Sequence, residues 1–235
     1  MTLLFSDETN EVPFGTPAWD DLMVEYRAFG DEARRRGAMI AGAPLQSTET
    51  ATTLRLQGGR FIPIDGPYAE TKEQLGGFYI LECSDEAEAI ELAALIPTAK
   101  YGSVEVRAMA SNEARQFERS GTSYIVLIYG AEADYFPPGD PRMTAGISQH
   151  QALTERTIAS GEYVSGDGLG PPSTAKTVSV RTGESLVVDG PFAETKEQLG
   201  GYYIFACADL DRALVLASEI PVASGSLEVR PLLEV

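Results

Sequence analysis

The stretch that decides the fold occurs twice: residues 65–80 read DGPYAETKEQLGGFYI, and residues 189–204 read DGPFAETKEQLGGYYI. Fourteen of the sixteen positions are identical, and the other two exchange Tyr and Phe. The second stretch stands 124 residues after the first. Solenoid repeats have periods of only about 20–50 residues, so this spacing indicates the tandem duplication of a whole domain.

Matching residues continue on both sides of the repeated stretch. One residue is lost near the end, so Glu-Val-Arg at 105–107 corresponds to Glu-Val-Arg at 228–230. We therefore predict a first domain over 1–110 and a second over 123–235. The segment 111–122 between them is polar and lacks large aliphatic residues, which is typical of a linker. The pairs that keep the offset of 124 are Gly37 and Gly161, Gly42 and Gly166, Cys83 and Cys207, and Pro97 and Pro221.

Composition excludes several classes of protein. The chain has 235 residues with 18 Lys and Arg against 35 Asp and Glu, a net charge of −17. That balance argues against binding to nucleic acid or anionic membranes, which needs clustered cations. No apolar run approaches the roughly 20 residues of a membrane span, and the N-terminus does not resemble a signal peptide, so we expect a cytoplasmic protein. With one His and two Cys, a Cys/His zinc site is excluded, and we predict no cofactor.

Each copy has the pattern of a small α+β domain. A strand and an amphipathic helix are followed by a short strand and a hairpin with arms at 52–57 and 60–64, or 176–181 and 185–188. The segment Ala-Glu-Thr-Lys-Glu-Gln-Leu is predicted as a short helix or turn. A strand at 78–83, a second helix capped by Asp85 and stopped by Pro97, and a final strand over 104–109 complete the unit.

This order predicts a ferredoxin-like fold, with two helices on one face of an antiparallel sheet. The other face of such a sheet needs a cover. We therefore expect the two copies to pack face to face as a pseudo-dimer within one chain, of the dimeric α+β barrel type. Whether the chain dimerises again is left open.

The motif DGP-[YF]-A-E-T-K-E-Q-L-G-G-[FY]-Y-I resembles the YCII-related, or DGPF-domain, family. The likeness extends over both copies and includes the closing Val-Glu-Val-Arg strand of the first. It implies a ferredoxin-like fold related to the dimeric α+β barrels. Relatives of that fold include isomerases, dehydrochlorinases and cofactor-independent oxygenases, and some family members are encoded beside extracytoplasmic sigma factors.

His150 is the sharpest candidate for chemistry. It lies on the predicted apolar stripe of its helix, where an imidazole facing the sheet can act as acid or base near neutral pH. The resemblance implies that a histidine at this place pairs with an aspartate. The alternative is a core histidine that is hydrogen-bonded to backbone. Copy one has Tyr26 at the equivalent position, so the two halves are expected to be unequal, with Tyr26 contacting a ligand or the pocket degenerate.

Asp189 and Asp65 open the repeated motif. Asp189 is predicted to orient His150, and Asp65 to contact substrate. The alternative for both is turn formation, because Asp before Gly-Pro readily bonds its own backbone.

Charged residues follow each DGP sequence. Lys196 and Glu194 in copy two, and Lys72 in copy one, are predicted substrate contacts, and Lys196 could neutralise an anionic ligand. A solvated charged face is the alternative. Cys83 and Cys207 are expected to be small core residues, and Tyr129, Tyr202 and Tyr203 to pack on the sheet, although one of the tyrosines could line a pocket.

Two functions are compatible with these patterns. The first is an enzyme of isomerase, lyase or dehydrochlorinase type, independent of metal and nucleotide, in which His150 and Asp189 transfer a proton on a small molecule. The second is a non-catalytic small-molecule-binding or regulatory module, linked to stress signalling through sigma factors. The absence of a histidine in copy one favours the second.

Overall fold

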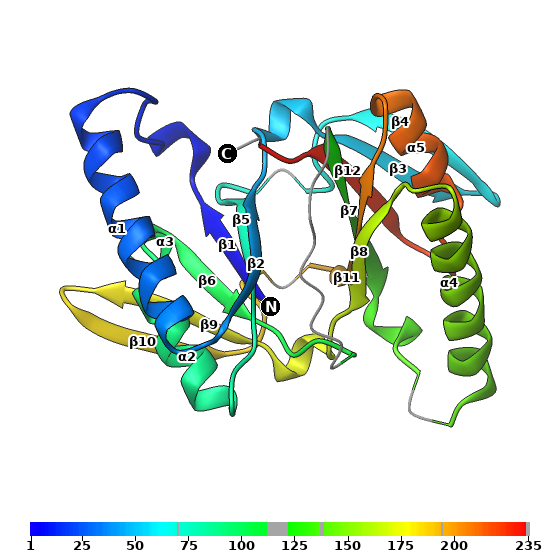
Figure 1. Cartoon of the computed structure of the whole chain (residues 1–235). Coiled ribbons are helices and arrows are strands. Elements are labelled where there is room, and N and C mark those ends of the chain that lie inside the picture. The colour runs from blue at the N-terminus through cyan, green and yellow to red at the C-terminus, as the bar shows by residue number, and fades with distance from the viewer. Residues whose placement is uncertain (70, 112–121, 137–138, 194, 234–235) are drawn as a thin grey trace. The chain divides into compact units, whose positions relative to one another are not determined.

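The computed structural model describes residues 1–69, 71–111, 122–136, 139–193 and 195–233. Copy one contains β1 (Thr2–Ser6), α1 (Pro17–Arg35), β2 (Met39–Pro44), β3 (Thr52–Gln57), β4 (Arg60–Asp65), β5 (Gln74–Leu81), α2 (Glu86–Leu95), α3 (Thr98–Tyr101) and β6 (Ser103–Val106). Copy two contains β7 (Ser123–Ala131), α4 (Pro141–Ala159), β8 (Tyr163–Gly168), β9 (Lys176–Arg181), β10 (Glu184–Asp189), β11 (Glu197–Ala206), α5 (Leu210–Ser218) and β12 (Ser226–Pro231). Figure 1 shows these elements along the chain. No helix within the described residues is both long and apolar enough to cross a bilayer.

The strands form two six-stranded sheets with equivalent orders. One sheet has the order β10-β9-β6-β1-β5-β2, and the other has the order β4-β3-β12-β7-β11-β8. Neighbouring strands are antiparallel throughout both sheets. The predicted α+β class, with two tandem ferredoxin-like domains, is confirmed.

The β-hairpins are exchanged between the copies. The hairpin β9–β10 of copy two extends the sheet of copy one, where Val178 pairs with Val104. The hairpin β3–β4 of copy one extends the sheet of copy two, where Leu54 pairs with Leu227. The chain accordingly divides into two compact units, which we call unit 1 (Met1–Leu45, Glu70–Gln116 and Ser173–Ala193) and unit 2 (Gln46–Ala69, Phe117–Pro172 and Glu194–Val235).

Because the hairpins are exchanged, the two sequence repeats and the two compact units do not coincide. The predicted boundaries, 1–110 and 123–235, describe the repeat in the sequence, whereas each compact unit is assembled from both copies. Apart from its end residues 111 and 122, the predicted linker lies outside the described residues. The face-to-face pseudo-dimer stays a prediction.

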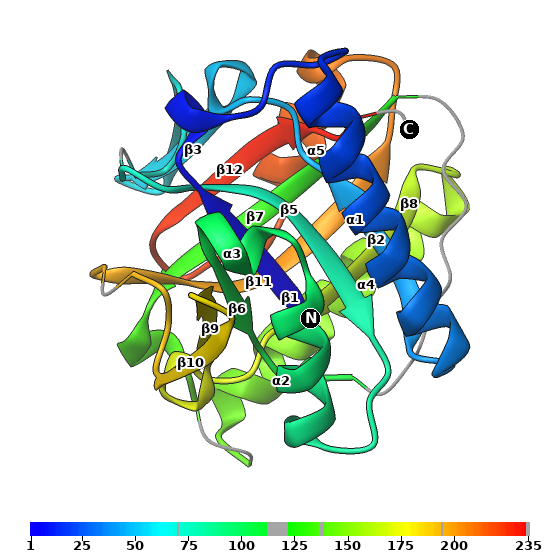
Figure 2. The ribbon, with the colours of Figure 1, turned by 90° about the vertical axis from the view of Figure 1, so that its left-hand side faces the viewer.

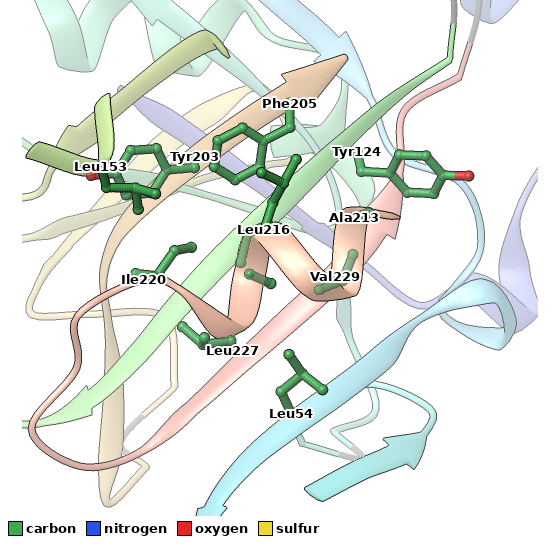
Figure 3. Packing of buried hydrophobic residues seen from close by; sticks show 12 residues of the cluster. Leu54, Tyr124, Leu153, Tyr203, Phe205, Ala213, Leu216, Ile220, Leu227 and Val229 are labelled. Carbon is green, nitrogen blue, oxygen red and sulfur yellow. The ribbon is translucent and has the colours of Figure 1, made fainter. Parts of the chain in front are cut away.

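The helices of each unit cover one face of its sheet, because their apolar sides pack on alternate strand residues. In unit 1, Phe29 of α1 and Leu92 of α2 meet Leu4, Val104 and Val178. Figure 2 shows α1, α2 and α3 in front of the strands of this sheet. In unit 2, Leu153 of α4 and the inner side of α5 meet β3, β7, β11 and β12. The buried cluster there comprises Leu54, Tyr124, Val126, Leu153, Tyr203, Phe205, Ala213, Leu216, Ala217, Ile220, Leu227 and Val229 (Figure 3).

Local signals fix the ends of the helices. Thr16 caps α1, and its hydroxyl accepts from the Trp19 N–H at 3.3 Å. The predicted Asp85 cap of α2 is confirmed by a 2.9 Å bond from the Glu88 N–H. Gly37 follows α1 with a φ of +72°, which L-residues rarely adopt.

Two sequence-based boundaries were wrong. The segment predicted as a short helix or turn ends inside a strand, because β5 begins at Gln74, which pairs with Ser6. The final strand predicted over 104–109 ends earlier, because β6 spans Ser103–Val106. The helix predicted between the Asp85 cap and Pro97 is confirmed as α2, and α3 follows Pro97 as an additional short helix. Copy two has no counterpart of α3 among its described residues.

Candidate functional site

His150 lies on the side of α4 that faces the sheet. It precedes the buried Leu153 by three residues, which places both on one side of the helix. Its ring is partly buried, and Nδ1 is 2.9 Å from Oη of Tyr203 on β11. The two rings are nearly parallel, with centroids 5.9 Å apart. The predicted inward orientation of the histidine agrees with this geometry.

Tyr203 is held firmly by its neighbours. It is only 5% exposed, and its ring stacks on Phe205 at a centroid distance of 5.5 Å. On the neighbouring strand, a Cβ at Gly166 would lie 2.7 Å from the Tyr203 ring. The glycine therefore allows the close approach that places the phenol under His150. Gly42 allows the same close approach of Tyr79 in unit 1, which explains why both copies have glycine at this position.

Burial sets the protonation of both groups. It lowers the pKa of His150, and a hydrogen bond to the Pro221 backbone acts in the opposite direction. Proline has no backbone N–H, so the imidazole donates to the Pro221 carbonyl. When that proton sits on Nε2, Nδ1 accepts the hydroxyl proton of Tyr203. Burial raises the pKa of Tyr203, opposed by a bond from Thr154, so both groups are neutral near pH 7.

The residue of unit 1 that is equivalent to His150 is Tyr26, and its hydroxyl has two hydrogen-bond partners. Oη of Tyr26 lies 2.7 Å from Oγ1 of Thr98 and 2.9 Å from Oη of Tyr101. Both partners belong to α3, which copy two lacks in its described part. Burial raises the pKa of Tyr26 well above its usual range, so the phenol stays neutral. The predicted ligand contact of Tyr26 stays a prediction, and its hydroxyl already has two partners.

The motif aspartates end the outer strand of each exchanged hairpin. Asp189 has an 87% exposed side chain, and its Oδ1 is 2.7 Å from Nζ of Lys176 on β9. That bond lowers the pKa of Asp189. Asp189 belongs to unit 1 and His150 to unit 2, so their predicted pairing stays a prediction. The turn at the motif is made by Gly66 and Gly190, whose φ angles are +102° and +104°.

Asp65 is the motif aspartate that shares unit 2 with His150. Its strand β4 is the edge of the sheet, and Asp65 pairs with Thr52. Asp65 and Tyr203 belong to one row of paired residues that crosses the sheet from β4 to β11. They are four strand spacings apart, which amounts to roughly 19 Å. Asp65 therefore does not reach the histidine within this unit.

The charged residues of the motif lie at the surface where they are described. Lys72 is 85% exposed, and its Nζ is 3.9 Å from the carboxylate of Asp7. Lys196 is also exposed, and Glu194 lies outside the described residues. Their predicted substrate contacts stay predictions.

Much of the identity between the two motifs has a structural cause. Oγ1 of Thr71 donates to the carbonyl of Glu73 at 2.6 Å, and the amide of Gln74 donates to the carbonyl of Thr71 at 2.8 Å. The same two bonds link Thr195, Glu197 and Gln198. The motif therefore closes its own loop in both copies.

The position after DGP is anchored on a buried glutamate. The N–H of Tyr68 donates to Oε2 of Glu228 at 2.8 Å, and Arg230 bonds the other oxygen of the same carboxylate. In unit 1 the N–H of Phe192 donates to Glu105, whose partner is Arg107. All four charged side chains are at most 5% exposed. Sequence reasoning missed this role, although charged residues alternating with valine or leucine in a repeated strand were a usable signal.

Among the described residues, no three His, Cys, Asp or Glu side chains are grouped so that they could hold a metal ion. Cys83 and Cys207 are partly buried free thiols at the edges of the two cores. Burial raises the pKa of Cys207 to about 11, so it stays protonated near pH 7 and is a weak nucleophile.

Comparisons with known proteins agree with the repeat. The family model of the YCII-related domain matches residues 3–111 and matches again over 122–235. An uncharacterized protein of Rhizobium meliloti (strain 1021), R00369, is 39% identical over 115 residues, which cover 46% of this chain and 90% of the relative. That relative therefore corresponds to a single copy of the repeat.

Proposed function

The chain belongs to the YCII-related family, and we propose that it is an enzyme that moves a proton on a small organic substrate, with His150 as the acid–base group. The reaction would be of the isomerase, lyase or dehydrochlorinase type, in which one proton shuttle suffices and no metal, nucleotide or other cofactor is invoked. The observation that carries the proposal is the 2.9 Å contact between His150 Nδ1 and Tyr203 Oη.

A neutral imidazole beside a neutral phenol supports a proton relay. As a substrate proton reaches the Tyr203 oxygen, the Tyr203 proton passes to Nδ1, and the steps reverse to protonate the product. The lowered pKa of His150 keeps the imidazole able to accept a proton near neutral pH. The rigid packing of Tyr203 between Phe205 and Gly166 holds the pair in position.

The remaining roles are secondary parts of the proposal. Asp189 would orient His150, and Lys196 and Glu194 would contact the substrate. Asp189→Asn tests the first role separately, because the exposed carboxylate can be neutralised without opening a cavity.

Hydrogen–deuterium exchange tests the proposal without knowledge of the substrate. A panel of small carbon acids (2-oxo acids, 1,3-dicarbonyls and unsaturated lactones) is incubated with the protein in D₂O, and the loss of C–H signals is followed by proton NMR. We expect the wild-type chain to catalyse exchange in at least one compound. His150→Gln should slow it by 10²–10⁴-fold, which is the usual contribution of a general acid–base group.

Tyr26→Phe is the matched control, because it changes the equivalent position of unit 1 and leaves His150 in place. Exchange should continue at the wild-type rate in this variant. Equal rates in wild type and His150→Gln would contradict the proposal, provided that circular dichroism shows the variant to be folded.

A second candidate is a non-catalytic small-molecule-binding or regulatory module, including one in sigma-factor stress signalling. The hydrogen bonds of Tyr26 in unit 1, and the bond from His150 to the Pro221 backbone, favour it, since both fit purely structural groups. Because the chain has a single histidine, its ring signals report binding directly. A compound that shifts those signals without any exchange would favour this candidate.

A further inference from the structure

Strand β10 forms one edge of the sheet of unit 1 and is exposed along its whole length. Among the described strands it pairs with β9 alone. Its centre is a run of three apolar residues, Leu186, Val187 and Val188, which are 56%, 41% and 53% exposed. An uncovered apolar edge strand is a template for pairing with another strand, and proteins usually block such edges with charges or proline.

The backbone groups of alternate β10 residues point away from β9. The Gly190 N–H donates to the Ala175 carbonyl at 2.9 Å, so these residues form a hydrogen-bonded pair that continues the β9–β10 register. Hydrogen-bonded and non-hydrogen-bonded pairs alternate along an antiparallel ladder. The N–H and C=O groups of Ser185, Val187 and Asp189 therefore point outward, where a further strand can bond them.

The equivalent edge strand of unit 2, β4, has proline at the central outward position. The Gly66 N–H donates to the Ala51 carbonyl at 2.9 Å, so the same alternation holds in the hairpin β3–β4. Pro63 corresponds to Val187 and has no N–H to offer to another strand. The two hairpins share one backbone plan, but β4 lacks the central outward donor that β10 has.

The charges of the hairpin β9–β10 cancel, although the whole chain has a net charge of −17. The charged residues of the hairpin are two cations and two anions, Lys176, Arg181, Glu184 and Asp189. Nζ of Lys176 lies 2.7 Å from Oδ1 of Asp189, so the charge at that end of β10 is already compensated. A second copy can approach along this edge without local repulsion, since salt screens the more distant charges.

We propose that β10 pairs antiparallel with β10 of a second copy of this chain, about a two-fold axis at Val187. This register places Val187 opposite Val187 of the second copy, and Leu186 opposite Val188. Ser185 then lies opposite Asp189. All three outward residues of each strand bond the other strand, and no like charges lie directly opposite one another. A two-fold contact of this kind is closed, so the assembly stops at a dimer.

Other registers bond fewer residues. Outward residues must face outward residues, so the two strands can shift only in steps of two. A shift in one direction places Asp189 opposite Gly183 of the turn, and a shift in the other places Ser185 opposite Pro191. The register centred on Val187 is therefore the one that uses the whole strand. This dimer does not involve His150 and is independent of the proton-transfer proposal.

Sedimentation velocity on the full chain, from micromolar to millimolar concentration, tests the dimer. A pair of six-residue strands is a small interface, and small interfaces are typical of weak association. We expect a monomer–dimer equilibrium that shifts toward the dimer across this range. Amide hydrogen exchange by NMR tests the register. The amides of Ser185, Val187 and Asp189 should exchange more slowly at high than at low protein concentration, whereas those of Leu186 and Val188, which face β9, should not change.

Val187→Pro gives β10 the proline that β4 has at Pro63. The Val187 N–H points away from β9, so the hairpin keeps its ladder and should stay folded. The variant loses both hydrogen bonds at the two-fold axis, and we expect the dimer to weaken at least tenfold.

Val188→Glu and Ile64→Glu are a matched pair, because they add the same charge at equivalent exposed positions of β10 and β4. Val188→Glu places a carboxylate opposite Leu186 of the second copy and should weaken the dimer at least tenfold. Ile64→Glu should leave it unchanged.

The proposal is overturned if the wild-type chain is monomeric at millimolar concentration, or if Val187→Pro, shown to be folded by circular dichroism, dimerises like the wild type. It is equally overturned if Ile64→Glu weakens the dimer as much as Val188→Glu, or if the three outward amides gain no protection at high concentration.

Discussion

Unit 1 and unit 2 have one backbone plan and two sets of side chains. One row of paired residues crosses each sheet from the hairpin aspartate to the glycine under the tyrosine. The rows are Asp189, Lys176, Val106, Thr2, Tyr79 and Gly42 in unit 1, and Asp65, Thr52, Val229, Val126, Tyr203 and Gly166 in unit 2. The comparison teaches that the strongest sequence identity marks the scaffold, whereas His150, which we propose as the acid–base group, stands at a position that diverged.

The clearest divergence is above the tyrosine of each row. In unit 1, Tyr26 is bonded to Thr98 and Tyr101 of α3. In unit 2, His150 bonds Tyr203 instead, and the described part of copy two has no such helix. Copy two is one residue shorter than copy one between Pro221 and Gly225. This loss accompanies the change from the phenol of copy one, which has two hydroxyl partners, to the titratable imidazole of copy two.

We expect the largest losses of stability at the buried glutamates that anchor the exchanged hairpins. Glu228→Ala removes the carboxylate that the buried Arg230 bonds, and with it the acceptor of the Tyr68 N–H. We expect the free energy of unfolding, measured in urea, to fall by about 3–5 kcal/mol, as is usual when one partner of a buried ion pair is removed. Glu105→Ala should cost a similar amount, because Arg107 and Phe192 depend on it in the same way.

The double variant Glu228→Leu with Arg230→Met separates the ion pair from the anchor. It removes both charges together, so the cost should fall well below that of the single variant. If the single and double variants are equally unstable, the anchoring of the Tyr68 N–H, rather than the uncompensated charge of Arg230, dominates.

The fold could be predicted because its signals are local. Repeat spacing, helix stripes and caps such as Asp85 act within a few residues, and the structure confirms the α+β class they predict. The hairpin exchange could not be predicted, since hairpins β3–β4 and β9–β10 have the same pattern whichever sheet they extend. The site was only partly visible: His150 stood out by its residue type, whereas Tyr203 resembled every other aromatic residue of a sheet.

A second prediction sharpens the comparison at the glycines under the tyrosines. Gly166→Ala places a methyl group 2.7 Å from the Tyr203 ring, and Gly42→Ala places one 2.3 Å from the Tyr79 ring. Both variants should lose about 1–3 kcal/mol of stability through overpacking. Only Gly166→Ala should shift the His150 ring signals in NMR, because only Tyr203 bonds the histidine. A shift of equal size in Gly42→Ala would contradict the assignment.

The smallest expected effect concerns the pH dependence of stability. Burial lowers the folded pKa of His150, so the unfolded chain takes up the proton first as the pH falls through about 6.5. Stability in urea should therefore decrease from pH 8 to pH 5.5, a range chosen to lie above the titration of ordinary carboxylates. His150→Gln should remove that part of the decrease, while Tyr26→Phe should keep it.

Tyr203→Phe removes the hydrogen bond between Tyr203 and His150 and so tests it directly. Losing one buried hydrogen bond should cost about 0.5–1.5 kcal/mol, measured by urea unfolding at pH 8. If Tyr203 donates to Nδ1, the bond stabilises the neutral imidazole, and its loss must raise the pKa of His150 in an NMR titration. A fall would mean that Nδ1 carries the proton and donates to the phenol. The imidazole could not then accept the Tyr203 proton, so the direction of this one shift decides whether a relay from Tyr203 to His150 can operate.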